Sequence, residues 1–396
     1  MAAADATRHS TSWPPLHIRL SELPQARSAR QAAAAVPTAF LPICGLGILD
    51  ALAARRTSVI TRDDVLAAQR RTAGWVRRTP VLQAEGPART GPSGLGSASG
   101  DALLWLKCEY LQHTGVFKAR GAMNRQLAAH ERGEMNSIVG VVAASGGNAG
   151  LANAWAASAL GVPATVFVPT TAPRVKVERL RQYGARVHQV GVEYAEAYEA
   201  AMSHVETTGA VFCHAYDQPD IAAGAGVIGE ELLEDIPDLD VVIVAVGGGG
   251  LFAGVAAAVE GRSRVVAVEP VTAPTLHAAL REGRPVDVAV SGVAADALGA
   301  RRIGDVAFDV ASRTTPSSVL VDDNAIVAAR AALWQDYRIV AEHGAATAWA
   351  ALTSAAWTPS SGERVAVVVC GANTDVSTLQ SQDVIHPPIN RSRCPR

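Results

Sequence analysis

The sequence predicts an α/β protein made of two three-layer αβα domains with mostly parallel sheets. From residue 57 onward, short runs rich in Val and Ile alternate with Ala-rich helical segments. This alternation is typical of parallel strands that are buried on both faces by helices. The chain has 396 residues, of which 49% are hydrophobic, so it is long enough for two cores of this kind.

The individual elements follow the same alternation along the chain. The first helix is expected to begin after Thr61, a residue type that caps helices, with Asp63 and Asp64 in its first turn. Strands are expected at 102–110, 137–145, 164–169, 185–191, 210–214, 264–270 and 363–373, and 240–250 is expected to be a strand that runs into a glycine loop at 247–250. Helices are expected at 150–160, 172–184, 193–208 and 251–261.

This order of elements suggests a division of the chain into two domains and two terminal segments. The larger domain is expected to combine residues 57–136 with 217–385, and the smaller one to comprise 137–216. Residues 1–56 are expected to form a poorly ordered extension, and residues 386–396 a tail.

Composition limits the kind of partner. The formal net charge is −2, from 35 basic and 37 acidic side chains, which argues against nucleic acid or an anionic membrane surface as partner. The most apolar segment, 32–54, is interrupted by Pro37, Pro42 and Asp50, so a membrane span is not expected, and it starts too far along the chain for a typical secretory signal. Five cysteines without a CxxC pair suit a reducing cytoplasm.

Two glycine-rich turns join a predicted strand to a predicted helix. In the first, Gly247 to Gly250 allow backbone N–H groups to converge on an anion at a helix N-terminus. No lysine follows these glycines, so a triphosphate-binding P-loop is not expected. A turn that merely permits close packing of strand and helix is the alternative.

The second turn has the sequence SGGNAG at 145–150. Ser145 and Asn148, together with the backbone N–H groups of Gly146 to Ala149, offer donors to a carboxylate. Taken alone, this turn is better explained as a structural one, with Ser145 as a helix cap and glycines that allow the turn; the other glycine turn and Lys118 shift the balance toward a carboxylate site.

Lysine usage singles out one position. Only Lys107, Lys118 and Lys176 are lysines among 35 basic residues. Guanidinium groups stay protonated and are poor nucleophiles, whereas an ammonium group loses its proton readily when it is desolvated. A lysine at position 118 is therefore compatible with a covalent amine, while Lys107 and Lys176 are expected to be surface cations.

These features together resemble a known family. The segment KCEYLQHTGVFKARGA, 107–122, is similar to the lysine motif of the fold type II pyridoxal-phosphate enzymes, and within them of the threonine/serine dehydratases. The glycine turn at 247–250 resembles their phosphate loop, 145–152 their substrate loop, and CGAN at 370–373 the stretch that faces the pyridine nitrogen. The resemblance extends over residues 60–380 and implies a fold like that of the tryptophan synthase β-subunit.

The resemblance also implies roles for individual residues and for the domains. The larger domain would bind pyridoxal 5′-phosphate and the smaller one would carry the substrate loop. Lys118 would form the Schiff base and later remove the α-proton of the amino acid. The other implied contacts are Phe117 beside the ring, Asn148 at the phenolic oxygen, Cys370 opposite the ring nitrogen, and Gly247, Gly248, Gly249, Gly250 and Leu251 at the phosphate. The substrate carboxylate would be held by Ser145, Gly146, Gly147, Asn148 and Ala149.

Several positions depart from the family pattern. Val116, Ala149, Leu151 and Val227 replace residues that are usually more polar or smaller, so a drier site is expected. Racemase relatives carry a serine where this chain has Gly146, and glycine cannot transfer a proton. Racemisation is therefore not expected.

Two acidic residues leave alternatives open. Glu269 matches a glutamate that binds a divalent cation in some relatives, but Thr275 stands where they have an aspartate. Glu269 is thus only a weak metal candidate, and a complete site for a divalent cation is not expected. Glu342 is expected either to line the cofactor pocket or to act as a carboxylate at a helix N-terminus.

The implied activity is β-elimination from L-threonine or L-serine, which yields 2-oxobutanoate or pyruvate and ammonia. A β-replacement synthase of the cysteine-synthase kind is the alternative, although VFKAR at 116–120 fits the dehydratase motif better than S-V-K-D-R. Elimination from another β-hydroxy amino acid and a non-catalytic ligand-binding protein are further alternatives. A homodimer in the cytoplasm, without a C-terminal regulatory region, is the family expectation.

Overall fold

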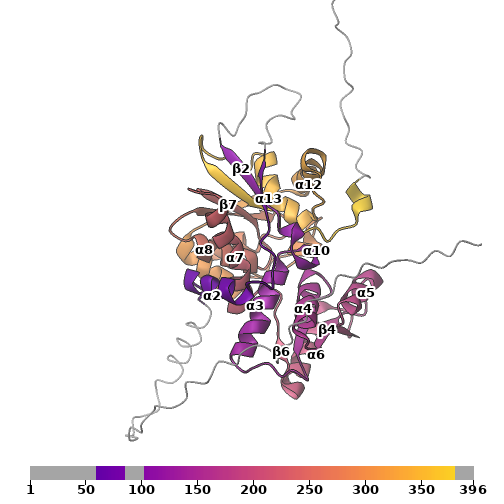
Figure 1. Ribbon diagram of the computed structural model, residues 1–396. Coiled ribbons are helices and arrows are strands. Elements are labelled where there is room, and N and C mark those ends of the chain that lie inside the picture. The colour runs from indigo at the N-terminus through magenta and orange to yellow at the C-terminus, as the bar shows by residue number, and fades with distance from the viewer. Residues whose placement is uncertain (1–58, 85–101, 380–396) are drawn as a thin grey trace, which may run out of the picture.

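The computed structural model describes residues 59–84 and 102–379 (Figure 1). The predicted N-terminal extension, the C-terminal tail and the apolar segment 32–54 lie outside the described residues. In the described part of the chain, no helix is long and apolar enough to cross a membrane.

A six-stranded sheet forms the larger layer, with the strand order β1–β2–β10–β7–β8–β9. Only β1 is antiparallel to its neighbour; every other pair is parallel. The last strand of the chain lies in the middle, since Val365 of β10 pairs with both Leu104 of β2 and Val241 of β7. The strands are β1 (Val81–Ala84), β2 (Leu103–Lys107), β7 (Val241–Ala245), β8 (Arg264–Pro270), β9 (Ser317–Val321) and β10 (Arg364–Val368).

A separate four-stranded sheet has the order β5–β4–β3–β6 and is parallel throughout. Its strands come from one continuous stretch of chain: β3 (Val141–Ala144), β4 (Ala164–Val168), β5 (Arg186–Gln189) and β6 (Val211–Phe212). Figure 1 shows this part, with α4, α5 and α6, set beside the larger sheet.

Helices cover both sheets. Those after the small-sheet strands are α4 (Asn148–Leu160), α5 (Arg174–Gln182) and α6 (Tyr194–Thr208). Those around the large sheet are α2 (Arg62–Thr72), α7 (Pro219–Asp235), α8 (Gly250–Val259), α9 (Thr275–Glu282), α10 (Ala295–Leu298), α11 (Asp305–Thr314), α12 (Asp323–Tyr337) and α13 (His343–Thr353). The 3₁₀ turns are η3 (Glu109–Leu111), η4 (His113–Gly115) and η5 (Val376–Leu379).

Helix α3 (Lys118–Glu131) links the two sheets. Its residues Ala122, Met123 and Leu127 belong to the hydrophobic core beneath the small sheet. Its other neighbours include α7, and Gly121 of α3 lies so close to Ile221 of α7 that a Cβ would meet the Ile221 carbonyl oxygen at 2.6 Å. The helix that begins with Lys118 is therefore held from both sides.

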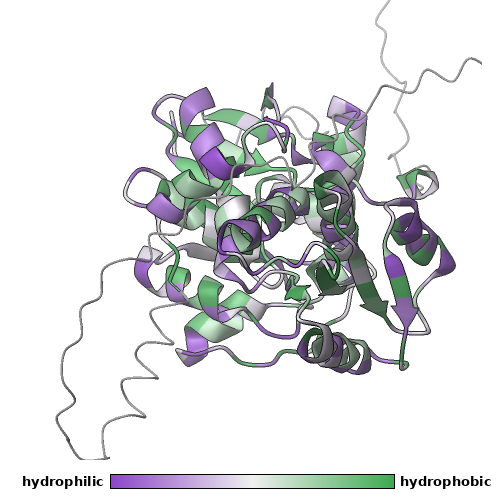
Figure 2. Cartoon of the chain, turned by 60° about the horizontal axis from the view of Figure 1, so that its bottom comes forward, coloured by the Kyte–Doolittle hydropathy of each residue, from purple (hydrophilic) through white to green (hydrophobic). Residues whose placement is uncertain are grey.

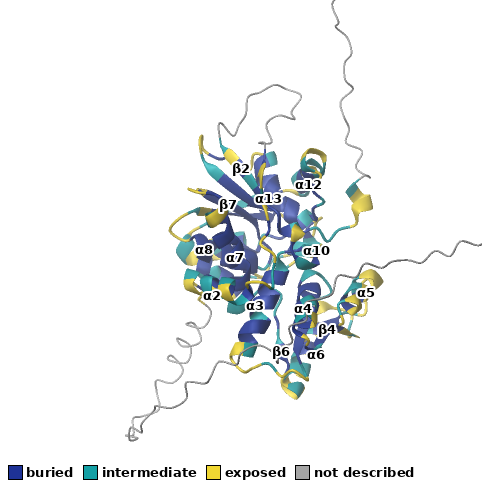
Figure 3. Cartoon of the chain, viewed as in Figure 1, coloured by how far each residue is buried: buried dark blue, intermediate teal, exposed yellow. Residues whose placement is uncertain are grey.

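The cores are built from the strands that the sequence predicted. Every residue of β7 and of β4 is buried, and the helices α7, α8 and α13 around the large sheet are buried over most of their length (Figure 3). Hydrophobic residues concentrate on the strands and the inner helices, while purple, polar residues mark the outer surface (Figure 2). Strands buried on both faces require continuous apolar runs, and this is the pattern that the sequence contains.

The predicted fold class is confirmed, and Thr61 caps α2 through a capping box with Asp64. Strands β1 and β9 were not predicted from the sequence, and neither were the helices α3, α7 and α9 to α13. Strand β1 has only four residues and is partly exposed, and β9 begins with two serines and is only partly buried. Edge strands of this kind lack the long apolar run that marks a central strand.

Candidate active site

Lys118 is the first residue of α3, and its neighbour Phe117 is the N-cap. The Lys118 Nζ atom lies 4.8 Å from the centre of the Phe117 ring and 3.5 Å from the carbonyl oxygen of Ala215. Burial lowers the pKa of the Lys118 ammonium, while Cys370 and Glu342 act in the opposite direction. A lysine of lowered pKa has a larger fraction of free amine, which is the nucleophilic form.

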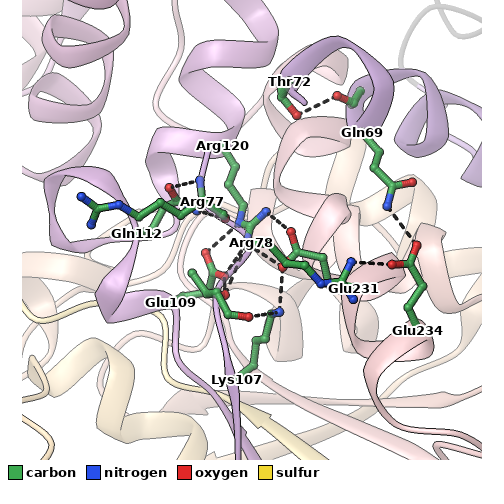
Figure 4. Close-up of polar contacts among 12 residues, drawn as sticks. Gln69, Thr72, Arg77, Arg78, Lys107, Glu109, Gln112, Arg120, Glu231 and Glu234 are labelled. Atoms are coloured by element: carbon green, nitrogen blue, oxygen red, sulfur yellow. Dashed lines mark hydrogen bonds and ion pairs between the residues drawn. The ribbon is translucent and has the colours of Figure 1, made fainter. Parts of the chain in front are cut away.

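Behind Lys118, a cluster of four buried charged side chains fixes the start of α3 (Figure 4). Arg120, two residues after Lys118, contacts Glu109 at 2.8 Å and Glu231 at 2.7 Å. Lys107 completes the cluster, with its Nζ 2.7 Å from Glu231 and 2.8 Å from the carbonyl oxygen of Thr79. Two cations and two anions balance one another, which is how buried charges are tolerated.

The cluster corrects one expectation. Lys107 was expected to be a surface cation, but its side chain has no exposed area. Its anionic partner, Glu231, lies on α7, far along the chain, so local sequence gave no indication of the pair. The lysine motif of the sequence contains three members of this cluster. They are Lys107 on β2, Glu109 on η3 and Arg120 on α3.

The first glycine turn joins β7 to α8 and has no room for side chains. A Cβ at Gly248 would meet the Tyr216 ring at 2.3 Å, and one at Gly250 would meet the Tyr216 carbonyl oxygen at 2.7 Å. Gly249 has φ +92°, which favours glycine. The Thr275 hydroxyl donates to the Gly247 carbonyl oxygen at 2.6 Å and fixes the turn from behind.

The same turn leaves donors available. The first N–H groups of α8, which starts at Gly250, have no carbonyl partner within the helix. The helix dipole adds partial positive charge at this end, so the turn suits a phosphate group. Gly250 and Leu251 line one pocket with Phe117, Lys118 and Ala149, which brings the predicted lysine, phosphate turn and substrate turn together.

The second glycine turn joins β3 to α4 and is open. The Ser145 Oγ accepts a hydrogen bond from the Gly147 N–H at 3.3 Å. A Cβ at Gly146 would lie 3.4 Å from a methyl of Val168, and one at Gly147 would meet no described atom within 4 Å. Asn148 starts α4 and directs its side chain across to the large sheet.

Comparison with known proteins identifies the family. The model of the family described as "Pyridoxal-phosphate dependent enzyme" matches residues 73–371 of this chain. The chain belongs to the pyridoxal-phosphate-dependent enzymes.

Individual proteins of known activity are also similar to this chain. The chain is 37% identical to L-threonine ammonia-lyase of Thermotoga maritima, over 81% of this chain and 77% of the relative. It is 34% identical to phenylserine dehydratase of Ralstonia pickettii, over 77% of this chain and 90% of the relative. Among solved structures it resembles maize serine racemase, with a TM-score of 0.73 and 31% identity over 81% of this chain and 96% of that one.

The residues present fit the cofactor of this family, pyridoxal 5′-phosphate. The site offers an amine of lowered pKa at Lys118, an anion-binding turn without side chains at 247–250, and an aromatic ring at Phe117. Cys370 lies buried just after β10, and its carbonyl oxygen accepts a hydrogen bond from the Phe117 N–H at 3.0 Å. Burial raises the pKa of the Cys370 thiol, so it stays neutral.

Glu342 resolves one of the open alternatives. It is the N-cap residue of α13, but its carboxylate makes no cap hydrogen bond. Both carboxylate oxygens instead accept from the Asn148 side-chain amide, at 2.9 and 3.0 Å. Burial raises the pKa of Glu342, and the hydrogen bond from Asn148 opposes this shift. Glu342 is therefore in contact with the predicted site residue Asn148 and is not a carboxylate of the helix end alone.

Glu269, the weak metal candidate, is engaged elsewhere. Its carboxylate oxygens accept from the Leu276 N–H at 2.7 Å and from the His277 N–H at 2.8 Å, and one of them lies 3.0 Å from the Thr275 hydroxyl oxygen. Burial raises the pKa of Glu269 to about 7. In the described part of the chain, no group of three or more His, Cys, Asp or Glu side chains is placed to hold a metal ion.

Proposed function

We propose that this enzyme eliminates the β-hydroxyl group of L-threonine or L-serine and releases 2-oxobutanoate or pyruvate with ammonia. The observation that carries the proposal is the position of Lys118, whose amine of lowered pKa lies in a pocket shared with the phosphate turn and the substrate turn. L-Threonine ammonia-lyases from Thermotoga maritima and Geobacter sulfurreducens, at 37% and 38% identity, support this activity.

Lys118 has two roles in this proposal. It would hold the cofactor covalently, and its amine, when free, would remove the α-proton of the bound amino acid. The cofactor, when bound, supplies an electron sink for the negative charge that develops at the α-carbon. Because burial keeps the pKa of Lys118 below its ordinary value, the amine can act as a general base near neutral pH.

The other site residues would bind and orient the cofactor. We assign the phosphate to the N–H groups of Gly247, Gly248, Gly249, Gly250 and Leu251, the ring face to Phe117, and the phenolic oxygen to Asn148. The neutral thiol of Cys370 faces the ring nitrogen in this proposal. Cys370 would therefore give the ring nitrogen an uncharged partner, which suits loss of a β-hydroxyl group.

We assign the substrate carboxylate to the turn between β3 and α4. Ser145 and the N–H groups of Gly146, Gly147, Asn148 and Ala149 surround the start of α4, where the helix dipole favours an anion. The space beside Gly147, where a Cβ would meet no described atom within 4 Å, is room for that carboxylate.

The domain organisation and assembly are part of the proposal. Residues 57–136 and 217–385 would bind the cofactor, and residues 137–216 would carry the substrate turn. We further propose a homodimer in the cytoplasm. Three described cysteines, Cys108, Cys213 and Cys370, are free and buried, which is compatible with a reducing compartment. Sedimentation of the purified protein tests the dimer.

The decisive experiment measures release of 2-oxo acid from L-threonine and L-serine by the cofactor-loaded enzyme. We expect steady release that Lys118→Ala abolishes, with loss of the absorption of covalently bound cofactor. Lys118→Arg is the matched control, because it keeps the charge but cannot form the covalent link. Normal cofactor absorption without release from either amino acid would contradict the proposal, and formation of a thioether product after addition of a thiol would favour β-replacement.

A further inference from the structure

A chain of hydrogen bonds connects the small-sheet side of the molecule to the site. It starts at Arg179 on α5, a half-buried side chain whose Nη2 atom donates to Asn373 Oδ1 at 2.9 Å. Among the described residues, Arg179 has no acidic partner within ion-pair distance, so the amide oxygen of Asn373 is the acceptor that the guanidinium uses. Arg179 and Asn373 also line a pocket together with Gly146, Gly147 and Asn148 of the substrate turn.

The chain continues through two side-chain amides to a buried carboxylate. Asn373 Nδ2 donates to Asn148 Oδ1 at 2.8 Å and to the Thr114 carbonyl oxygen at 3.0 Å. Asn148 Nδ2 donates in turn to both carboxylate oxygens of Glu342. The chain therefore runs from the Arg179 cation through the two asparagine amides to the Glu342 anion. Each donor in it faces an acceptor.

This polarity fixes the rotation of both amides. If Asn373 turned over, its NH₂ group would face the Arg179 guanidinium and its oxygen would face Asn148 Oδ1, so a donor would meet a donor and an acceptor would meet an acceptor. If Asn148 turned over, its oxygen would face the Glu342 carboxylate. Two buried or half-buried repulsions of this kind each cost more than an ordinary lost hydrogen bond.

We propose that Arg179 is a positioning residue for Asn148: through Asn373 it fixes the orientation in which Asn148 meets the cofactor. The inference rests on the proposed contact of Asn148 with the phenolic oxygen, to which one of the two Nδ2 hydrogens would donate while the other serves the Glu342 carboxylate. Because Arg179 lies on α5 while Asn373 follows β10 of the large sheet, the amide orientation depends on how α5 is seated over the site.

A second contact from α5 allows an effect on the orientation of the Asn148 amide to be distinguished from an effect on the packing of α5. Lys176, one turn before Arg179, forms an ion pair with Asp296 on α10. This pair also joins α5 to the large-sheet side and lines the same pocket as Arg179, but it makes no hydrogen bond to the amide chain. Losing Lys176 therefore weakens the docking of α5 and leaves the polarity of the chain intact.

The experiment compares Arg179→Ala, Arg179→Lys and Asn148→Ala with two controls, Lys176→Ala and Arg181→Ala, in the cofactor-loaded enzyme without substrate. Arg181 is an exposed arginine on the same helix. The first readout is the pH at which the absorption of the bound cofactor changes, because a hydrogen bond at the phenolic oxygen sets that pH. Thermal unfolding of each variant reports folding.

We expect Arg179→Ala and Asn148→Ala to move the spectral transition in the same direction, by about one pH unit for the loss of one hydrogen bond. The two controls should leave the pH of the transition unchanged, and Arg179→Lys should shift it less than Arg179→Ala does. With substrate, Arg179→Ala should lower kcat by roughly ten- to a hundredfold and change KM less.

An unchanged spectral transition in Arg179→Ala, with a shift in Asn148→Ala, would overturn the role of Arg179. An equal shift in Lys176→Ala would also overturn it, because docking of α5 would then explain the effect. Since these readouts need no turnover, they are independent of the 2-oxo acid assay, in which failure of the wild-type enzyme would count against the proposed function.

Discussion

The two glycine turns of the site follow parallel strands in different sheets, yet their glycines serve opposite purposes. At the turn between β7 and α8, a Cβ on any of the four glycines would lie 2.8 Å or less from a neighbouring atom. At the turn between β3 and α4, Gly146 and Gly147 have room for a Cβ. The first turn needs glycine because protein already fills the space, whereas the second keeps the space open.

This difference indicates which group each turn receives. In the first, packing of Tyr216 and Ala307 against the glycines holds the backbone rigid, so its N–H groups present one fixed anion site. In the second, Ser145 and Asn148 contribute side chains and the open volume can hold a substrate that enters and leaves. A resident phosphate suits the first arrangement and a transient carboxylate the second.

The largest expected effect comes from a methyl group added to the crowded turn. In Gly249→Ala the Cβ would lie 2.4 Å from the Ala307 Cβ, at a residue with φ +92°. We expect the free energy of unfolding to fall by about 2–4 kcal/mol, from backbone strain and overpacking together, and cofactor affinity to fall with it. Urea unfolding and cofactor titration measure both.

Gly147→Ala is the matched control for that variant. It adds the same methyl group where no described atom lies within 4 Å and φ is −105°. Its free energy of unfolding should stay within about 1 kcal/mol of the wild type. An equal loss of cofactor in both variants would remove the distinction between the two turns.

An intermediate effect is expected for Thr275→Val, which removes the hydroxyl behind the phosphate turn. The Gly247 carbonyl oxygen loses its donor at 2.6 Å in a fully buried position. An unsatisfied buried acceptor costs about 1–3 kcal/mol, so unfolding free energy and cofactor affinity should both decrease. Thr275→Ser keeps the hydroxyl and should behave like the wild type; a parallel loss in Thr275→Ser would point to packing instead.

The smallest structural effect is expected for Gly146→Ser, which adds a hydroxyl group to the open turn. Its Cβ would lie 3.4 Å from Val168, an ordinary contact, so stability should change by less than about 1 kcal/mol. A serine hydroxyl at this position could carry a proton, as glycine cannot, and we expect the variant to form measurable D-amino acid from the L-enantiomer. Chiral chromatography of the reaction mixture detects it. Gly146→Ala, which has no hydroxyl, is the control and should form none.

The sequence predicted those parts of the molecule that short segments specify. The strands β3, β4, β7, β8 and β10 consist mostly of apolar residues, and both glycine turns and Lys118 lie in contiguous motifs. Each is determined by neighbours along the chain, so pattern and residue chemistry suffice to find it.

Contacts between distant segments were not predictable in this way. Lys107 looked like a surface cation because nothing near it in the chain reveals Glu231 on α7. Arg179 was not singled out, since its position on an amphipathic, charged helix is typical of a solvated residue, and Asn373 lies 194 residues further along. Charged residues are recognised as buried only when the partner that neutralises them is known.

The central place of β10 in the large sheet has a consequence for how the protein is made. Strands β2 and β7 flank β10. During translation, each of them therefore has one edge without a hydrogen-bonded neighbour until residues 364–368 have been synthesised. Exposed edges of apolar strands invite pairing with other chains. Nascent chains are therefore expected to depend on chaperones for most of translation, and a chain that terminates before residue 364 should aggregate rather than retain a partial sheet.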